Sequence, residues 1–435
     1  MLSEFVSRYR DSLNPDANIT VLRQILDSIT EQLLKNYVKT QENFQSGPYC
    51  KLYEILLEKV TEDRTLERYR FHIKKAFYDN LVKLIPQKIP IFAFSWVEII
   101  SHPCFMEKLL TDGRAKSMQM FHDLLKYLLE FMEPFLRRVA LTHSLRLLYK
   151  SVLRIFTILM NKFPNFLSQC YYSFCDSIPL NCIQLRNIIL CAIPETVINL
   201  IKDGHQYAEV EQNALIPDVL PGFEEPLISS GLNLPLNRFL REGEPKDFLV
   251  SLGQALLSNA KTESDPNFQP KNSFIYPSNQ NYNIKLFNSL IFYIGSYSVA
   301  ISQDNFHNSH TLIHSYQIFH HLASSLDTEG RYILFNSIIN HLRYPNKHTQ
   351  WFLSLLCHLV LNISDVFIKE LIARIFLERL MTSDPYPWGL RVAFKELVCK
   401  KEYQFSPDEF NISSNELLQL TMQAFGICRQ YSEDR

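Results

Sequence analysis

The chain has 435 residues, enough for one large domain or for two to three ordinary ones. Hydrophobic residues make up 46% of it and charged residues 20%, which excludes a disordered chain. Forty-four basic and 45 acidic side chains give a net charge of −1, so no overall field draws the protein to nucleic acid or to an anionic membrane. Only 11 residues are glycine, which argues against Gly-rich phosphate loops and doubly wound sheets.

Helical periodicity begins near the N-terminus and recurs along the chain. In ITVLRQILDSITEQLL the apolar positions form one stripe: Leu22, Ile25, Leu26, Ile29 and Leu33. MFHDLLKYLLEFMEP predicts a helix that ends at Pro134, and HSLRLLYKSVLRIFTILMNKFP predicts one that ends at Pro164, because proline cannot donate a helical hydrogen bond. Alternation with period two is almost absent. We predict an all-α fold, an α-solenoid of degenerate HEAT-like helical hairpins.

Residues 203–282 interrupt this pattern. They hold 8 of the 21 prolines, together with several Asn, Ser and acidic residues, and one short helix is predicted around PKDFLVSLGQALLS. We interpret this stretch as a connector, either packed or mobile, between helical-repeat blocks at 1–202 and 283–435 of one continuous domain.

Targeting and cysteine signals indicate a soluble, intracellular protein. The N-terminus MLSEFVSRYR has an acid at position 4 and no apolar core for a signal peptide. We find no run that reaches the roughly 18 apolar residues of a membrane span. The nine cysteines contain no C-x-x-C pair, which fits reduced thiols.

Two polar clusters invite a functional reading. FHNSHTLIHSYQIFHH could bind a metal through histidines at helical spacing, but it has no carboxylate at the H-E-x-x-H position, so structural or surface histidines are the simpler interpretation; they are His307, His310, His314, His320 and His321. RTLERYRFHIKKAFYDNL places Arg64, Arg68, Arg70, Lys74 and Lys75 on helical faces. A solvated basic face is the simpler interpretation there, with contact to an acidic peptide or RNA as the alternative.

Catalytic motifs are absent. The sequence has no G-x-S-x-G elbow, no Walker or dinucleotide loop and no paired-carboxylate frame. We expect no enzyme activity, no catalytic residue, no cofactor and no metal.

The stretch from Leu326 to Val360 predicts two helices joined by a turn at Tyr344–Pro345. Asp327 is placed to cap the first helix and Thr349 the second, while Gly330 would allow close packing. Arg331 and Arg343 remain available for salt bridges or for a partner.

This stretch resembles a known family. LDTEGRYILFNSIINHLRYPNKHTQWF is similar to the strongest signature of the C-terminal domain of the large Not-one scaffold subunits of the CCR–Not deadenylase complex. Three further stretches follow the family in the right order: PIFAFSWVEIISHPCFMEKLL, FCDSIPLNCIQLRNIILCAIP and LERLMTSDPYPWGLRVAFKELV. All three tryptophans fall inside these motifs, and the resemblance spans about residues 65–410.

The resemblance implies a HEAT-like platform without chemistry of its own. It implies assembly of the Not-two and Not-three/five subunits through their extended anchor segments and Not-box domains, and in some lineages the docking of short repressor peptides such as those of Nanos. It also implies roles in mRNA deadenylation, mRNA decay and translational repression, in the cytoplasm including P-bodies and in the nucleus. Such subunits are far longer than this chain, so we expect it to be a C-terminal portion.

The first 60 or so residues, the segment 255–280 and the tail EYQFSPDEFNISSNELLQL depart from the family pattern. Seven residues at helix ends and turns are predicted partner contacts, with packing or capping inside the domain as the alternative: Arg331, Arg343, Tyr344, Asn346, His348, Tyr386 and Trp388. A generic solenoid adaptor for other peptides or RNA predicts the same composition but not the ordered motifs. No sequence-specific nucleic acid and no membrane is expected as a partner.

Overall fold

A computed structural model describes residues 15–62, 69–139, 141–203, 217–257, 282–302 and 308–403. These residues form two compact units, unit 1 up to Ile155 and unit 2 from Phe156 onward. Within the described ranges every extended element is helical, and the single β-bridge, Leu257 to Tyr282, belongs to no strand. The predicted all-α class is confirmed.

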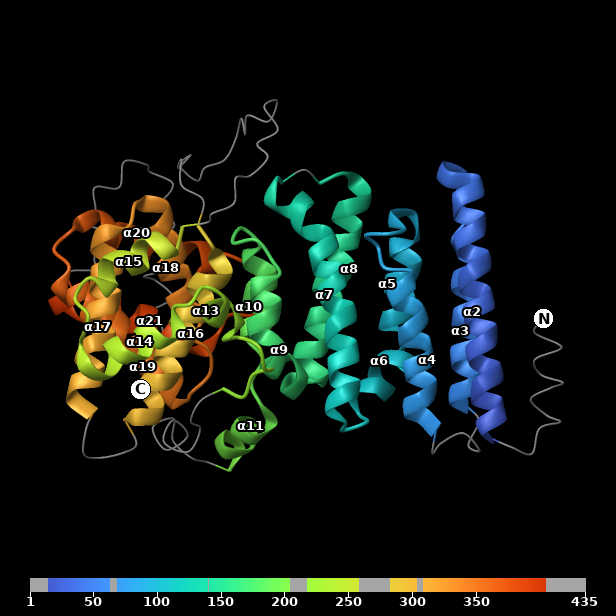
Figure 1. Cartoon of the computed structure of the whole chain (residues 1–435), viewed down its shortest axis with the longest axis horizontal. Helices are drawn as coiled ribbons and strands as arrows, with labels where there is room; N and C mark the ends of the chain where they lie inside the picture. The colour runs from blue at the N-terminus through green and yellow to red at the C-terminus, as the bar shows by residue number, and fades with distance from the viewer. Residues whose placement is uncertain are drawn as a thin grey trace. The chain divides into compact units, whose positions relative to one another are not determined.

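Unit 1 consists of α-helices of 8 to 26 residues that lie side by side (Figure 1), and their contacts define two rows. Helix α2 contacts α4 and α4 contacts α7 in one row, while α3 contacts α5 and α6 in the other. This arrangement of neighbouring hairpins is the one that HEAT-like repeats use. The helices are α2 (Pro15–Thr40), α3 (Gly47–Glu62), α4 (Arg70–Lys83), α5 (Ala93–Ser101), α6 (Pro103–Leu110), α7 (Ala115–Arg137) and the first part of α8 (His143–Lys162), with short 3₁₀ turns η1 (Gln41–Asn43) and η3 (Pro90–Phe92).

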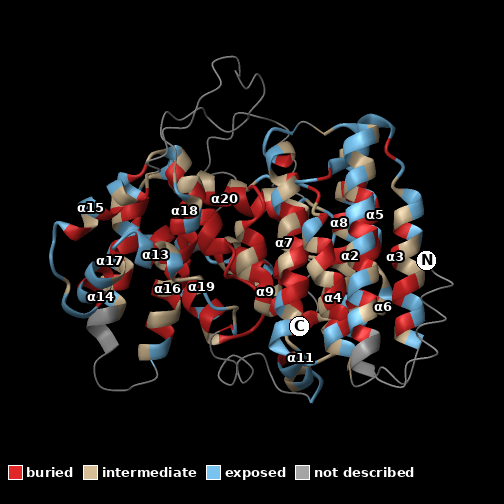
Figure 2. Cartoon of the chain, turned by 45° about the vertical axis from the view of Figure 1, so that its right-hand side comes forward, coloured by how far each residue is buried: buried red, intermediate tan, exposed pale blue. Residues whose placement is uncertain are grey.

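The predicted apolar stripes face the core of unit 1 (Figure 2). Leu22, Leu26 and Leu33 of α2 are buried, whereas Ile25 is half-buried at the edge of the stripe. Helix α8 ends before Pro164, as predicted. The predicted end of α7 at Pro134 is wrong: the helix continues to Arg137, because a proline inside a helix removes one hydrogen bond without preventing the next turn.

Unit 2 is organised around helix α16 (Ile284–Ile301), which contacts α9, α13, α17, α18 and α19. Asn283 caps it by accepting a hydrogen bond from the Leu286 amide at 3.1 Å. The other helices are α9 (Pro164–Asp176), α10 (Ile183–Leu190), α11 (Glu195–Lys202), α13 (Glu225–Ser229), α14 (Asn233–Glu242), α15 (Phe248–Ala255), α17 (Asn308–Ser325), α18 (Thr328–Ile339), α19 (Lys347–Asn362), α20 (Val366–Leu380) and α21 (Trp388–Cys399), followed by η4 (Lys401–Tyr403).

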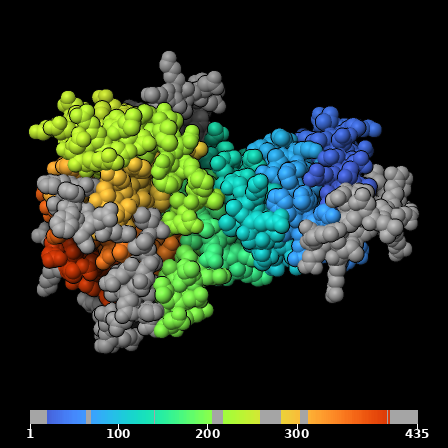
Figure 3. All heavy atoms as spheres, turned by 60° about the horizontal axis from the view of Figure 1, so that its bottom comes forward, coloured from blue at the N-terminus to red at the C-terminus, as the bar shows by residue number. Residues whose placement is uncertain are grey.

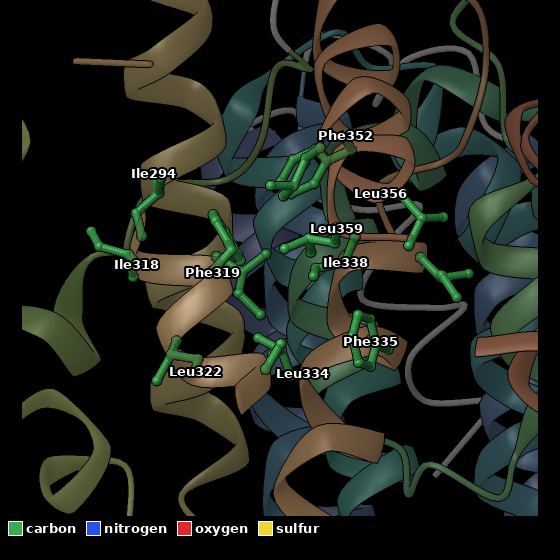
Figure 4. Packing of buried hydrophobic residues seen from close by; sticks show 14 of the residues in the cluster. Ile294, Ile318, Phe319, Leu322, Leu334, Phe335, Ile338, Phe352, Leu356 and Leu359 are labelled. Atoms are coloured by element: carbon green, nitrogen blue, oxygen red, sulfur yellow. The ribbon is translucent and has the colours of Figure 1, made fainter. Parts of the chain in front are cut away.

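The expectation that no run is long and apolar enough for a membrane span is wrong, since α16 passes that test over its 18 residues. The composition of α16 has a different explanation in this fold. Figure 4 shows Ile294 of α16 packed against Ile318 and Phe319 of α17, with side chains of α18 and α19 completing the same cluster. Helices that are apolar on most sides are typical of the centre of a core.

The predicted connector, residues 203–282, contains more helix than expected. The short helices α13, α14 and α15 lie beside α16 and α17, where Figure 3 shows their yellow-green atoms on the surface next to the orange ones. Leu236, Phe239 and Leu252 from these helices are buried in the core of unit 2. Much of the remaining connector lies outside the described residues, and the division into blocks 1–202, 203–282 and 283–435 stays a prediction.

Candidate partner-binding site

The turn between α18 and α19 and the first turn of α19 contain four of the seven predicted partner residues, and all four are buried in unit 2: Arg343, Tyr344, Asn346 and His348. Asp327 caps α18 as predicted, accepting from the Gly330 amide at 2.8 Å. Thr349 does not cap α19. Asn346 does so instead, because its Oδ1 accepts from the Thr349 amide at 2.7 Å. The Thr349 hydroxyl donates to the His341 carbonyl at 3.1 Å, so it closes the turn rather than the helix.

Arg343 lies at the centre of this turn. Its guanidinium is 3.7 Å from the ring centroid of Tyr171, a cation–π contact, and its Nη2 donates to Ser168 Oγ at 3.3 Å. Gly389, the second residue of α21, approaches the same backbone so closely that an added Cβ would lie 2.7 Å from the Leu342 carbonyl carbon. The turn is therefore a packed junction of α9, α18, α19 and α21, and its role as a partner contact stays a prediction.

Three arginines of unit 2 are buried without a salt bridge to any carboxylate among the described residues. Each donates to backbone carbonyls at or just after the C-terminal end of a helix: Arg186 to Cys175, Ile178 and Pro179 after α9, Arg343 to Leu190 and Ala192 after α10, and Arg379 to Asn336 in α18, all at 3.1–3.5 Å. Helix C-termini carry free carbonyls and partial negative charge, which compensates a cation. Burial still lowers the pKa of Arg379 to about 9. No pattern in the sequence indicated this arrangement.

Two buried histidines accompany Arg343. His341 and His348 have ring centroids 5.1 Å apart, and both pack on Phe352. Burial lowers the pKa of His348 to about 3, and the pKa of His341 lies well below its usual value, because burial and nearby positive charge both oppose protonation. Both imidazoles are therefore neutral at pH 7.

The remaining three predicted residues lie closer to the surface. Arg331 Nη1 is 3.4 Å from Asp365 Oδ2, and its side chain is 21% exposed. The Tyr386 hydroxyl donates to the Thr382 carbonyl, and Trp388 begins α21 with its side chain half-buried. These three remain the predicted residues with surface available to a partner.

One surface feature was missed. Leu361 at the end of α19 and Val366 and Phe367 at the start of α20 are 50%, 44% and 78% exposed, and we call these three residues the α19–α20 corner. Asp365, the cap of α20, pairs with Arg331 and so adds charge beside the apolar side chains. In the sequence, Phe367 lies just before the buried apolar stripe that starts at Ile368. This position outside the stripe is the one signal from which the exposure of Phe367 could have been predicted.

One residue of each polar cluster takes a structural position, while Arg70 and His320 are exposed. His314 Nδ1 is 3.1 Å from the Leu240 carbonyl, and its ring lies against Gly243; His307 and the side chain of His310 lie outside the described residues. Lys74 is not on a solvated basic face but buried, next to the Lys108 carbonyl and 3.7 Å from Asp112 Oδ1. Arg64 and Arg68 lie outside the described residues.

Known proteins are similar to this chain in sequence. A family model for "CCR4-Not complex component, Not1" matches residues 55–424. The CCR4-NOT transcription complex subunit let-711 of Caenorhabditis elegans is 31% identical over 451 residues, covering 98% of this chain and 16% of that protein. General negative regulator of transcription subunit 1 of Schizosaccharomyces pombe is 26% identical, covering 92% and 18%. The chain thus spans less than a fifth of either relative.

Two solved structures share the fold. The NOT1 superfamily homology domain from Chaetomium thermophilum aligns with a TM-score of 0.80 at 23% identity, over 95% of this chain and 79% of that one. A Not1 C-terminal domain solved in complex with Not4 aligns with a TM-score of 0.71 at 21% identity, over 97% and 83%. The resemblance expected from the sequence motifs is confirmed: this chain belongs to the Not1 family of CCR4-Not complex components.

Proposed function

We propose that this chain is a non-catalytic scaffold domain that assembles Not-two and Not-three/five subunits into a CCR4-Not complex. In this role it supports mRNA deadenylation, mRNA decay and translational repression, in the cytoplasm including P-bodies and in the nucleus. Membership of the Not1 family supports the proposal. The observation that carries it is the α19–α20 corner, an exposed apolar surface on a helical framework whose central polar groups are used for packing.

The physical basis is the burial of apolar anchors. Extended anchor segments lose conformational entropy when they bind, so they must recover free energy by burying apolar side chains. Phe367, at 78% exposure, offers the largest apolar surface of the corner. Aromatic residues are frequent among the few positions that dominate binding energy, where truncation costs about 2 kcal/mol or more. Arg331 and Asp365 would lie at the polar rim, where they contribute orientation more than affinity.

Affinity capture from lysate with quantitative mass spectrometry tests this function. The full chain is expected to retain Not-two and Not-three/five, and Phe367→Ala is expected to reduce their recovery at least tenfold. Leu234→Ala is the matched control, because Leu234 is 82% exposed on α14 and outside the corner. Recovery of other peptides or RNA in place of Not subunits, or equal losses in both variants, would contradict the proposal.

A generic adaptor for acidic peptides or RNA is the second candidate. It is favoured by α8, which contains no acidic residue and exposes Arg146, Lys150 and Arg154 at successive turns. Among the described residues these three side chains have no ion pair. Charge reversal of all three should abolish capture of RNA or acidic peptides if this function dominates, and should leave capture of Not subunits unchanged if it does not.

A further inference from the structure

Unit 1 brings one thiol and two carboxylates together where α3 meets α5. The Sγ of Cys50 lies 3.8 Å from Glu54 Oε1 on its own helix and 3.5 Å from Glu98 Oε2 on α5. One ligand atom from each of the three residues lies within 4.8 Å of the other two. The Ser95 carbonyl oxygen is also 3.7 Å from the sulfur. Cys50 is buried, whereas Glu98 is exposed and leaves the cluster open to solvent on one side.

The cluster has more hydrogen-bond acceptors than the single thiol proton of Cys50 can bond to. A neutral thiol donates one weak hydrogen bond, yet three oxygen atoms surround this sulfur. Lys51 pairs with the other oxygen of Glu54 at 3.2 Å, on the solvent side. Glu98 has no ion pair among the described residues.

The spacing of the donor atoms suits a particular ion. Zinc binds thiolate sulfur at about 2.3 Å and carboxylate oxygen at about 2.1 Å, so the edge between these two ligands in a tetrahedron is about 3.6 Å. The two observed sulfur–oxygen distances to carboxylates, 3.5 and 3.8 Å, bracket that edge. A hard ion such as Mg²⁺ prefers six oxygen ligands and would not select a thiol. The set of one thiolate and two carboxylates is one that a borderline-soft ion accepts.

We propose that Cys50, Glu54 and Glu98 form a Zn²⁺ site that ties α3 to α5, with water in the fourth position. Binding replaces the thiol proton: Zn²⁺ forms a bond to the sulfur, and one H⁺ leaves to solvent. The exposed side of Glu98 provides the entry path. Because the ligands come from two helices, bound Zn²⁺ stabilises their contact, and the thermal midpoint of unit 1 should rise with Zn²⁺ concentration. This proposal runs against the expectation from the sequence that the chain holds no metal.

Titration of the full chain with Cd²⁺ and Zn²⁺ tests the site. Cd²⁺ is the spectroscopic probe, since its bond to a thiolate gives an ultraviolet charge-transfer band, and Zn²⁺ affinity is measured by competition with a chromophoric chelator. Cys50→Ser is expected to remove one equivalent of the Cd²⁺ band. Glu98→Gln, a change at an exposed position that should not affect folding, is expected to weaken Zn²⁺ binding at least tenfold. Cys104→Ser is the matched control, a half-buried thiol of α6 outside the cluster.

The predicted pattern is loss of binding in the Cys50 and Glu98 variants and full binding in the Cys104 variant. The proposal is overturned if the band survives Cys50→Ser, if it depends on Cys104 instead, or if Glu98→Gln binds Zn²⁺ as tightly as the parent chain. A dissociation constant for Zn²⁺ weaker than about 1 mM in the parent chain would also overturn it, because such binding would require no built site.

Discussion

Units 1 and 2 differ in the partners that their buried polar and charged side chains bind. In unit 1 the buried cation Lys74 lies beside a carboxylate, Asp112, and the Thr30 hydroxyl joins α2 to α4 through a neutral hydrogen bond to Asn80 Oδ1 at 2.7 Å. In unit 2 three buried arginines have no carboxylate partner among the described residues and bind the ends of helices instead. Helix ends therefore take the place of counter-ions in unit 2.

The two units also differ in how far apart in the sequence their stabilising contacts lie. Unit 1 is held by apolar stripes between neighbouring helices, which are local in sequence. In unit 2, Arg343 binds Ser168 across 175 residues, and Asn187 Nδ2 donates to the Arg379 carbonyl across 192 residues at 2.8 Å. Buried polar contacts tolerate few alternative arrangements, because an unsatisfied group is costly. We expect unit 2 to be the less tolerant of substitution at its polar centre.

The largest effect is expected for Arg379→Ala. It removes the donor to two side-chain oxygens, Asn340 Oδ1 at 2.6 Å and Asn336 Oδ1 at 3.0 Å, and it opens a cavity. We expect a loss of about 4 kcal/mol, measured as the local opening free energy of α18 by hydrogen exchange. Arg374→Ala on the same helix is the control, since its pair with Glu378 is partly exposed and worth less than about 1 kcal/mol. Similar losses in the two variants would remove the contrast between the units.

The next effect concerns pH and should be confined to unit 2. His341 and His348 are neutral when folded, with pKa values below the ordinary 6.5, so the unfolded chain binds more protons once the pH falls below about 6.5. Stability is therefore fully present above that pH and is lost as the pH falls toward about 3. From pH 7 to pH 5 His348 should cost about 2 kcal/mol, and His341 should add a loss of the same sign.

Calorimetry of the parent chain and of His341→Gln/His348→Gln at both pH values measures this effect. The double variant should lose most of the pH dependence of the transition assigned to unit 2. An unchanged pH dependence would show that the two rings do not carry it.

Gly389→Ala is expected to cost about 1–3 kcal/mol, because the new methyl would meet the backbone of Leu342 and Arg343 at 2.7 and 2.9 Å, and backbone cannot move aside cheaply. Gly253→Ala in α15 is the matched control, since nothing lies within 4 Å of its added Cβ. That substitution should stabilise α15 by about 0.5–1 kcal/mol. Thermal unfolding of the two variants should shift in opposite directions, and a shift of equal sign would contradict the close packing of α21 on the turn.

The smallest effect is expected for Asn346→Ala, which removes the cap of α19 and should cost about 1–2 kcal/mol. Thr349→Val tests whether the hydroxyl bonds of Thr349 to the turn matter separately. Chemical denaturation with m-values checked for constancy gives both numbers. A larger loss for the α18 cap variant Asp327→Ala than for Asn346→Ala would show that the half-buried start of α18 matters more than the buried turn.

Local sequence patterns predicted the helices and their buried faces well, but they did not predict the contacts between residues far apart in the sequence. Leu22, Leu128 and Ile372 are buried because their helical spacing places them on one face, and that spacing is visible in the sequence. Arg343 looked available for a partner because arginine is rarely buried without a counter-ion. Nothing near it in sequence showed that Leu190 and Ala192 would supply free carbonyls. The exposure of Phe367 was overlooked because an apolar residue next to a buried stripe is normally assigned to the core.

The central claim is that unit 2 binds other polypeptides through apolar surface, while its buried charges stabilise the fold. A binding measurement with a purified complex of Not-two and Not-three/five tests this claim most directly. Affinity of the full chain is measured in 0.15 and 0.5 M NaCl, with Phe367→Ala beside Leu234→Ala. The account predicts a change of less than threefold with salt and a loss of at least tenfold for Phe367→Ala alone. Dissociation by salt as steep as that of a phosphate-binding protein, with Phe367→Ala binding like the parent chain, would contradict it.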